Sequence, residues 1–400
     1  MTEIFTGNFT QQEPIPQAGI RAANAVMEHG RLHRYNVGPG EISETVALEE
    51  EFAAFLGAKY CLATSSGGAA IATALRATGV TAGTPVLTNA FTLAPVPGAI
   101  AAISAKPVFV ETTAALTMDA EDLAAKAAAS GAKHLLLSHM RGHQPNMEQT
   151  MALAETLGLT VIEDCAHTMG GMSCGLPSGR HGHVAAFSTQ TYKHINSGEG
   201  GFLTTDDAEI AARSILLSGS YMLYERHAAA PPAEVFEALR DVTPNVSGRM
   251  DNLRAAVLRP QLRELPDRVR RWAVLHDAVE DGLKDNPDIT LIPRDPSLVR
   301  VGSSFQMCLF DWPPERIEQL VSGCLARGVE LKWFGAPRAQ GYTSRYSHWR
   351  YAGSARLSAT DRILDGLIDM RLPLTFDEAD ARLIARIISE EVKKLASVPA

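Results

Sequence analysis

The feature that most constrains the fold of this chain is an alternation of short apolar runs and alanine-rich segments between residues 60 and 163. The runs are four or five residues long, and the segments between them have the composition of helices. Strands joined through helices form parallel sheets, because a parallel pair needs a crossover connection. We therefore expect an α/β fold, with a mostly parallel sheet and helices on both faces. The expected strands are Tyr60–Thr64, Pro85–Thr88, Pro107–Val110, His134–Ser138 and Thr160–Glu163.

The alternation weakens after Gly201, which indicates a second unit. Asp251–Leu283 predicts one or two long helices, with Pro260 and Pro266 as breaks or kinks because proline lacks an amide donor. Shorter strand-like and helical segments follow and fit a smaller α+β domain. We predict an N-terminal arm over residues 1–40, a large domain over residues 41–250 and a small domain over residues 251–400.

Composition excludes several classes of function. The formal net charge of the 400 residues is −8 and no block of Lys or Arg occurs, which argues against a nucleic-acid partner. The five cysteines form no C-x-x-C pair, so neither a zinc site nor a disulfide framework is predicted, and a reducing cytoplasm is the simplest setting. The N-terminus does not resemble a signal peptide. The most apolar stretch, Ala90–Ala105, contains two prolines and is too short to span a membrane.

Two residues point to a specific chemistry. Asp164 ends an apolar strand, and Lys193 lies in a loop that continues into Gly198-Glu199-Gly200-Gly201. This pairing suits pyridoxal 5'-phosphate (PLP), whose aldehyde forms a Schiff base with a lysine amine and whose pyridine nitrogen is held protonated by a carboxylate. Taken alone, Asp164 also reads as the cap of the next helix, and Lys193 as a surface lysine. In open α/β sheets, however, ligands bind at the carboxyl ends of strands.

A third motif, Ser65-Ser66-Gly67-Gly68, follows the first expected strand and precedes a helix. Glycines let backbone amides approach an anion, and a helix N-terminus favours negative charge, so this segment is a candidate phosphate cradle. An ordinary strand-to-helix turn is the alternative.

Together these motifs resemble the DegT family of PLP-dependent sugar aminotransferases, which have the aspartate-aminotransferase fold (fold type I). The resemblance implies a mostly parallel sheet of the seven-stranded type in the large domain. The resemblance extends from about Gly30 to the C-terminus, and its pieces occur in the order that the family shows. The lysine followed by GEGG is the most specific piece. Family members that remove a sugar 3-hydroxyl carry histidine at the position of Lys193, so lysine favours amino transfer over dehydration. The other pieces are residues 48–53, 65–68, 106–111, 163–167, 249–256 and 371–374.

The resemblance implies a role for each site residue. Lys193 and Asp164 are the expected catalytic residues: Lys193 carries the cofactor and shuttles a proton, and Asp164 pairs with the pyridinium nitrogen. His167 is expected near the phenolic oxygen, although a helix-start residue without a ligand is the alternative. The remaining expected cofactor-binding residues are Ser66, Gly67, Gly68, Leu93, Ser188 and Ser247.

The chain departs from the family pattern at four positions. Gly68 replaces the usual Thr, and Leu93 stands where an aromatic ring normally stacks on the cofactor. Gln190 replaces the usual His, and Ser247 replaces an Asn that normally reaches the phosphate of the neighbouring subunit. These departures indicate a divergent member of the family.

We expect a cytoplasmic homodimer with shared active sites, which transfers an amino group from an amino acid, glutamate or glutamine, to a keto-sugar or related ketone. No nucleic-acid or membrane partner is expected. A PLP-dependent sugar dehydratase or lyase and a non-catalytic PLP-binding regulator are the alternatives. A lyase of the cysteine-desulfurase type would need a reactive cysteine on a mobile loop, whereas Cys308 and Cys324 lie in strand-like and helical segments.

Two segments are candidate substrate surfaces. The first, residues 221–227, contains Tyr221, Tyr224, Arg226 and His227 and resembles an active-site loop. The second, residues 338–351, crowds Arg338, Arg345 and Arg350 among aromatic side chains. Guanidinium and aromatic groups bind anions and sugar rings, so we expect an anionic acceptor there; a solvated loop is the alternative.

Overall fold

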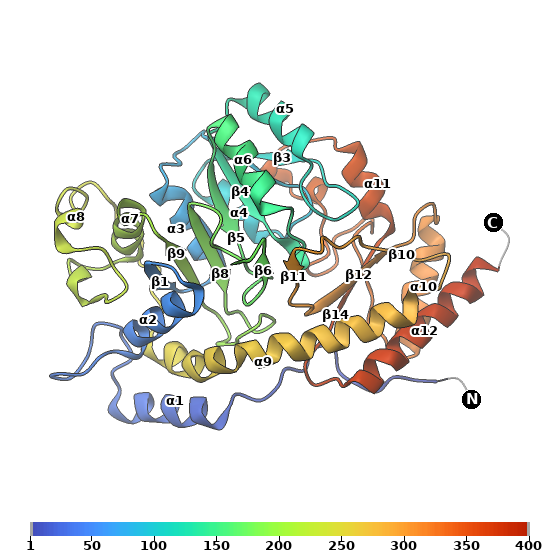
Figure 1. Cartoon of the computed structure of the whole chain (residues 1–400), viewed down its shortest axis with the longest axis horizontal. Helices are drawn as coiled ribbons and strands as arrows, with labels where there is room; N and C mark the ends of the chain where they lie inside the picture. Colours follow the sequence, from blue (N-terminus) through green and yellow to red (C-terminus); the bar gives the residue numbers. More distant parts are fainter. Residues whose placement is uncertain (1–2, 398–400) are drawn as a thin grey trace.

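The computed structural model describes residues 3–397, and its largest sheet has seven strands in the order β1-β9-β8-β5-β4-β2-β3 (Figure 1). Neighbouring strands are parallel except at β9, which runs antiparallel to both β1 and β8. The predicted α/β class with a mostly parallel sheet is confirmed. The bounds are β1 (Tyr60–Thr64), β2 (Pro85–Asn89), β3 (Lys106–Val110), β4 (His134–Ser138), β5 (Thr160–Asp164), β8 (Val184–Ser188) and β9 (Gly201–Thr205).

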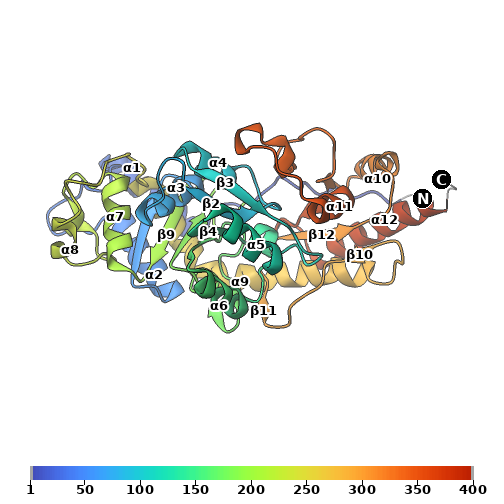
Figure 2. The same cartoon turned by 90° about the horizontal axis from the view of Figure 1, so that it is seen from above.

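Helices cover both faces of this sheet, and the strand residues alternate between the two cores (Figures 1 and 2). In β4, Leu136 packs in the core beneath α3 and α4, whereas Leu135 and Leu137 pack in the core beneath α5 and α6. Successive side chains of a strand point to opposite faces, so a strand buried on both faces is apolar throughout. The helices are α2 (Glu44–Leu56), α3 (Gly67–Ala77), α4 (Pro95–Ala102), α5 (Ala120–Ser130), α6 (Met147–Leu157), α7 (Ala208–Ser218) and α8 (Ala233–Glu237).

The long helix α9 (Asn252–Leu283) extends along the molecule and contacts α1 (Gln17–His29) and α2 as well as α12 (Glu378–Ala396) (Figure 1). Pro260 and Pro266 lie inside it, so of the one or two helices expected here the structure has one, and neither proline ends it. Each proline removes one helical hydrogen bond. Burial of neighbouring side chains, among them Leu262 and Leu265, offsets that loss.

A four-stranded antiparallel sheet, in the order β10-β12-β14-β13, lies beside the C-terminal half of α9. The helix α9 contacts α2, which packs on the seven-stranded sheet, and β12 of the four-stranded sheet. The predicted domain boundary near residue 250 therefore stays a prediction. A third, small sheet joins β11 to the β6–β7 hairpin. The elements are β10 (Thr290–Leu291), β12 (Ser304–Cys308), β13 (Lys332–Trp333), β14 (Leu367–Arg371), α10 (Pro314–Ala326), α11 (Ser358–Gly366), β11 (Leu298–Val299), β6 (Met172–Ser173) and β7 (Leu176–Pro177).

Several of these elements were not predicted from the sequence: β8, β9, α7, α11 and β14. No helix among residues 3–397 has the length and apolar character needed to cross a bilayer.

A buried ion pair joins the segment after α1 to α2. Arg34 donates to both carboxylate oxygens of Glu49 at 2.8 and 2.7 Å, and neither side chain is exposed. Burial alone would raise the pKa of Glu49, but the charges of Arg34 and His227 outweigh it and lower the pKa to about 2. Since this value lies below that of an unfolded chain, the pair stabilises the fold at neutral pH and loses that contribution as the pH falls toward 2.

We predict that Glu49→Gln lowers the free energy of unfolding by about 3–5 kcal/mol, because it leaves the Arg34 charge buried without a counter-charge. Urea denaturation at neutral pH measures the change. Glu209→Gln is the matched control, since Glu209 pairs with Arg213 on the exposed face of α7, and a change below about 0.5 kcal/mol is expected there. Equal effects of the two substitutions would contradict the prediction.

Candidate active site

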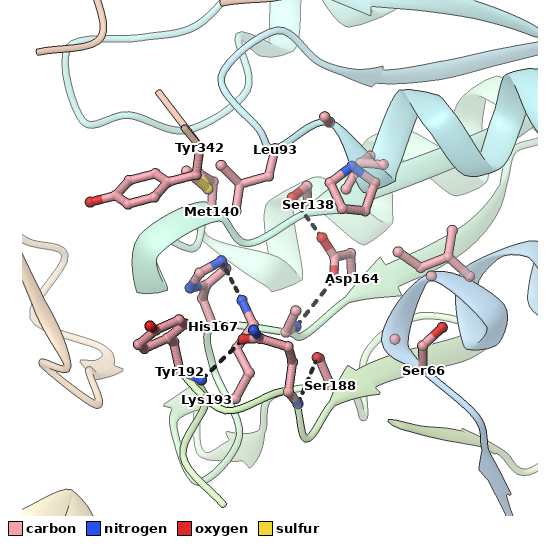
Figure 3. A pocket seen from close by; sticks show the side chains of 18 of the residues that line it. Ser66, Leu93, Ser138, Met140, Asp164, His167, Ser188, Tyr192, Lys193 and Tyr342 are labelled. Carbon is pink, nitrogen blue, oxygen red and sulfur yellow. Dashed lines mark hydrogen bonds between the residues drawn. The ribbon is translucent and has the colours of Figure 1, made fainter. Parts of the chain in front are cut away.

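A cavity of about 610 Å³ opens at the carboxyl ends of β4, β5 and β8 and at the N-terminus of α3. This is the edge of a parallel sheet at which α/β proteins bind ligands. Figure 3 shows Asp164, His167 and Lys193 directed into it, with Leu93 and Tyr342 across from Lys193. Eight of the nine predicted site residues line the cavity: Ser66, Gly67, Gly68, Leu93, Asp164, His167, Ser188 and Lys193.

Asp164 is the last residue of β5, and its carboxylate is buried. Ser138, at the end of the adjacent strand β4, donates to Oδ2 at 2.8 Å, and the amide of Ala166 donates to Oδ1 at 3.1 Å. Thr92 donates in turn to the Ser138 hydroxyl at 2.8 Å. These bonds fix the plane of the carboxylate and stabilise its charge, so that it can accept a hydrogen bond from a cationic group in the cavity.

The amine of Lys193 lies 3.0 Å from Nε2 of His167. The pKa of Lys193 is lowered to about 7: desolvation is the main cause, the cations of Arg141 and Arg371 add to it, and the carboxylate of Asp164 opposes these effects. Burial and the charge of Lys193 hold the pKa of His167 well below its ordinary value. At neutral pH the pair therefore consists of a neutral imidazole and an amine that is neutral much of the time, which is the nucleophilic form of lysine.

The first turn of α3 presents backbone amides to the cavity. Ser66 caps the helix by accepting from the amide of Ala69 at 3.0 Å. A Cβ atom on Gly67 would lie 2.8 Å from Cβ of Ser188, so only glycine permits this approach of the helix to β8. At Gly68 a Cβ would meet nothing closer than 3.9 Å, so packing does not require glycine at that position. The exposed amides and the Ser188 hydroxyl together form a site suited to a phosphate.

Two arginines of the cavity were not predicted as site residues. Arg141 follows β4 in a left-handed backbone conformation, with φ of 57°, and donates to Asp369 at 2.7 Å. Arg371 ends β14 and lies over the ring of Tyr192, with its Cζ 3.9 Å from the ring centre. The sequence signals were weak: Arg141 follows a strand end, and Arg371 begins the RLPL motif, but neither has a local pattern that marks it as a cavity residue.

Leu93 forms part of an apolar wall with Pro95, Val96 and Met140. Phe91 does not take its place, because it is buried and packs edge-on against Phe334. Contact with a bound ring at this wall would therefore be aliphatic.

Both predicted substrate surfaces lie mainly outside the cavity. In residues 221–227, Tyr224 stacks on Phe236, and His227 is buried beside Arg34 and Glu49. The exposed Ser247 also lies apart from the cavity of its own chain and accepts from Arg249 at 2.8 Å.

In residues 338–351, Arg345 is paired with Asp361 and Asp365 of α11, at 2.5 and 2.8 Å, so it is not available to a substrate. Arg338 lines a separate groove beside β13, and Arg350 is exposed. The three-arginine acceptor site expected there was wrong; of the segment's residues singled out in the sequence, the cavity includes Tyr342.

The sequence is similar to those of known aminotransferases. The sequence model of the DegT/DnrJ/EryC1/StrS aminotransferase family matches residues 17–389. The chain is 31% identical over 277 residues to L-glutamine:scyllo-inosose aminotransferase of Streptomyces griseus, covering 68% of this chain and 64% of that protein. It is 31% identical over 300 residues to dTDP-3-amino-3,4,6-trideoxy-alpha-D-glucose transaminase of Streptomyces venezuelae, covering 74% and 73%. The match to the first of these relatives thus spans slightly less than two thirds of its length.

The fold also matches a crystal structure of S. venezuelae DesV in complex with a ketimine intermediate. The TM-score is 0.78 at 26% identity, covering 96% of this chain and 95% of that one.

We predict that the amine of Lys193 in the cofactor-free chain titrates near pH 7. Competitive acetylation across a pH series, read by peptide mass spectrometry, gives the half-point, with the exposed Lys106 as reference. Arg141→Gln should move the half-point of Lys193 upward, because it removes a nearby positive charge that disfavours the ammonium form. A half-point that is unchanged in this variant, or one in the usual range of lysine in the parent, would contradict the electrostatic description.

Proposed function

We propose that this chain, which belongs to the DegT/DnrJ/EryC1/StrS aminotransferase family, is a PLP-dependent aminotransferase that acts on a keto-sugar or related ketone. The observation that carries the proposal is the position of the Lys193 amine. It is desolvated, 3.0 Å from His167, and lines the same cavity as the strand-end carboxylate of Asp164. A reactive amine beside a buried carboxylate and a phosphate cradle is the arrangement that PLP chemistry requires.

The residues of the cavity fit PLP. The first turn of α3 and Ser188 would hold the phosphate, since Gly67 lets the backbone come close to β8. Asp164 would hold the pyridine nitrogen, Leu93 would contact the ring face, and His167 would lie near the phenolic oxygen. When bound, PLP supplies an aldehyde that bonds covalently to amines and a ring that stabilises negative charge on the adjacent substrate carbon.

The protein contributes charge, proton transfer and exclusion of water. The hydrogen bonds from Ser138 and Ala166 fix the Asp164 carboxylate, so that it would accept a hydrogen bond from the ring nitrogen. The amine of Lys193 is neutral much of the time at neutral pH, so it could act as the base that moves the proton of the substrate carbon. Its contact with the neutral imidazole of His167 restrains the amine, and the apolar wall around Leu93 limits the access of water.

We propose an amino acid, glutamate or glutamine, as the amino donor. One relative is named as an L-glutamine:scyllo-inosose aminotransferase, which supports this donor. The name of the other, a transaminase of a dTDP-linked amino sugar, supports a sugar as the acceptor. A thiol-dependent lyase gains no support, because Cys308 and Cys324 are buried and burial raises the pKa of each thiol to about 12.

Borohydride reduction of the PLP-loaded protein, followed by peptide mapping, should place the pyridoxyl group on Lys193. Lys193→Ala should retain PLP through the phosphate cradle but lose donor-dependent conversion of the bound cofactor, read by its absorbance. Lys106→Ala, at an exposed lysine, is the matched control and should behave like the parent. Label on another lysine would contradict the assignment, and a parent that binds PLP but converts with no amino acid would favour a non-catalytic regulator.

We also propose a cytoplasmic homodimer with shared active sites. Ser247, in a left-handed conformation with φ of 61°, is exposed beside Arg249 and Tyr221. Tyr221, Met222, Val242 and Val246 of the same region are exposed as well. An apolar surface around polar groups is typical of an interface, and a twofold dimer would place the same patch of each subunit at the contact.

We predict that mixing a Lys193→Ala chain with a Ser247→Glu chain restores activity that neither has alone. The introduced carboxylate would repel the phosphate held by the partner. A mixed dimer keeps one intact site, so an equal mixture should recover roughly a quarter of the parent activity after subunit exchange. Full activity of the Ser247→Glu chain, or an active monomer in sedimentation, would contradict the shared site.

A further inference from the structure

The loop that carries Lys193, residues 189–200 (the lysine loop), is attached to the long helix α9. The ring of His194 lies edge-on against Trp272 of α9, with 5.2 Å between the ring centres, and its Nε2 atom lies 3.0 Å from the hydroxyl of Ser303. The next residue, Ile195, is fully buried in a core that also contains leucines of α9. The residues directly after Lys193 are therefore held against a helix from a distant part of the sequence.

Gln261 of α9 makes the most specific of these attachments. Its side chain is buried and pairs with both backbone groups of Asn196: Oε1 accepts from the amide at 2.9 Å, and Nε2 donates to the carbonyl at 2.8 Å. Nε2 also donates to the carbonyl of Val257 at 2.9 Å, and Arg268 donates to Oε1 at 3.4 Å. A glutamine amide has two N–H donors and an oxygen with two lone pairs, so its hydrogen-bonding capacity is fully used here.

The pairing with Asn196 fixes the lysine loop just after Lys193. On the other side, the amide of Lys193 donates to the carbonyl of Gln190 at 2.8 Å. The side chain of Asn196 accepts from the amide of Gly198 at 2.8 Å, which begins the turn into the GEGG motif. Because each residue of a peptide chain spans a limited length, release of Asn196 from α9 would let this turn move outward together with the backbone of Lys193.

The position of the Lys193 amine matters because its reactivity depends on burial. Nζ lies 3.0 Å from Nε2 of His167, and desolvation is the main cause of its lowered pKa. A loop that moved outward would admit water and return the amine toward the ammonium form. Reaction with an aldehyde also needs the two groups about 3–3.5 Å apart, and a displacement of about 1 Å can cost roughly a hundredfold in rate.

From this geometry we propose that Gln261 is a positioning residue for Lys193, which it holds in the cavity by docking the backbone of Asn196 on α9. The inference rests on the proposed function for the use that the amine serves, and it deepens that function by giving a role to a helix that does not line the cavity. Gln261 and Trp272 lie on opposite sides of Pro266, so an uninterrupted α9 keeps both against the lysine loop.

Gln261→Leu tests the proposal, because leucine is similar in size but forms no hydrogen bond with Asn196. In the cofactor-free variant, competitive acetylation should give a half-point for Lys193 that is higher by about one pH unit or more. With PLP added, labelling of Lys193 trapped with cyanoborohydride should be roughly 10- to 100-fold slower. Binding of pyridoxine 5'-phosphate, which has the phosphate but no aldehyde, should stay close to that of the parent, since it does not require the amine.

Three variants serve as comparisons. Gln261→Glu keeps an acceptor for the Asn196 amide and, when protonated, a donor for its carbonyl, so its half-point should move less. Gln319→Leu, at an exposed position of α10, should behave like the parent. Val279→Ala controls for stability, because it removes buried atoms of α9 from a core that contains no residue of the lysine loop. It should lower the unfolding midpoint and leave the half-point of Lys193 unchanged.

The half-point of Lys193 decides the outcome. If it does not move in Gln261→Leu, or moves as far in Val279→Ala, the proposal is overturned. If Gln261→Leu does not fold, the comparison of Gln261→Glu with Val279→Ala decides in the same way. If PLP labels no lysine of the parent but the half-point still moves in Gln261→Leu, the proposed function fails and the positioning of the amine by α9 stands.

Discussion

The site depends on the reversal of one strand. β8 is parallel to β5, so Ser188 at the end of β8 and Asp164 at the end of β5 lie at the same edge of the sheet. β9 returns antiparallel, with Gly201 paired to Ser188, so residues 189–200 must lie across that same edge. A parallel β9 would have needed a crossover on a face of the sheet. The reversal is therefore what places Lys193 over the carboxyl ends of the strands.

Close backbone packing then makes the reversal compatible with a phosphate cradle. A Cβ on Gly201 would lie 2.8 Å from the amide nitrogen of Gly67, and a Cβ on Gly67 would lie 2.8 Å from the Cβ atom of Ser188. Two glycines that face each other thus allow the first turn of α3 to approach β8 and β9. The same contacts bring the helix N-terminus next to the lysine loop, so that an anion site and a reactive amine share one cavity.

Local patterns in the sequence predicted the parts of this arrangement that depend on neighbouring residues. The alternation of apolar runs and alanine-rich segments predicted five strands of the large sheet. Asp164 and Lys193 were predicted as site residues from their positions at a strand end and in the loop before the GEGG motif. The alanine-rich run of β8 carries little strand preference, which explains why β8 was missed. The contact between Arg141 and Asp369 joins residues 228 positions apart, and no local pattern encodes it. Arg345 was misassigned for the same reason, because its partners lie on α11, a helix that was not predicted.

The charged groups of the cavity cost stability and at the same time set the protonation of Lys193. A left-handed Arg141 costs on the order of 1–3 kcal/mol, and the desolvated amine of Lys193 is held next to two arginines. Three hydrogen bonds to Asp369 keep Arg141 in place despite that cost. The positive field that results favours the neutral amine, which is the form of Lys193 that reacts with a carbonyl group. An anion that enters the cavity cancels part of this field, so binding of a carboxylate substrate would itself move Lys193 toward the protonated form. The placement of Arg141 and Arg371 thus couples the binding of an anion in the cavity to the protonation of Lys193, the residue proposed to transfer a proton.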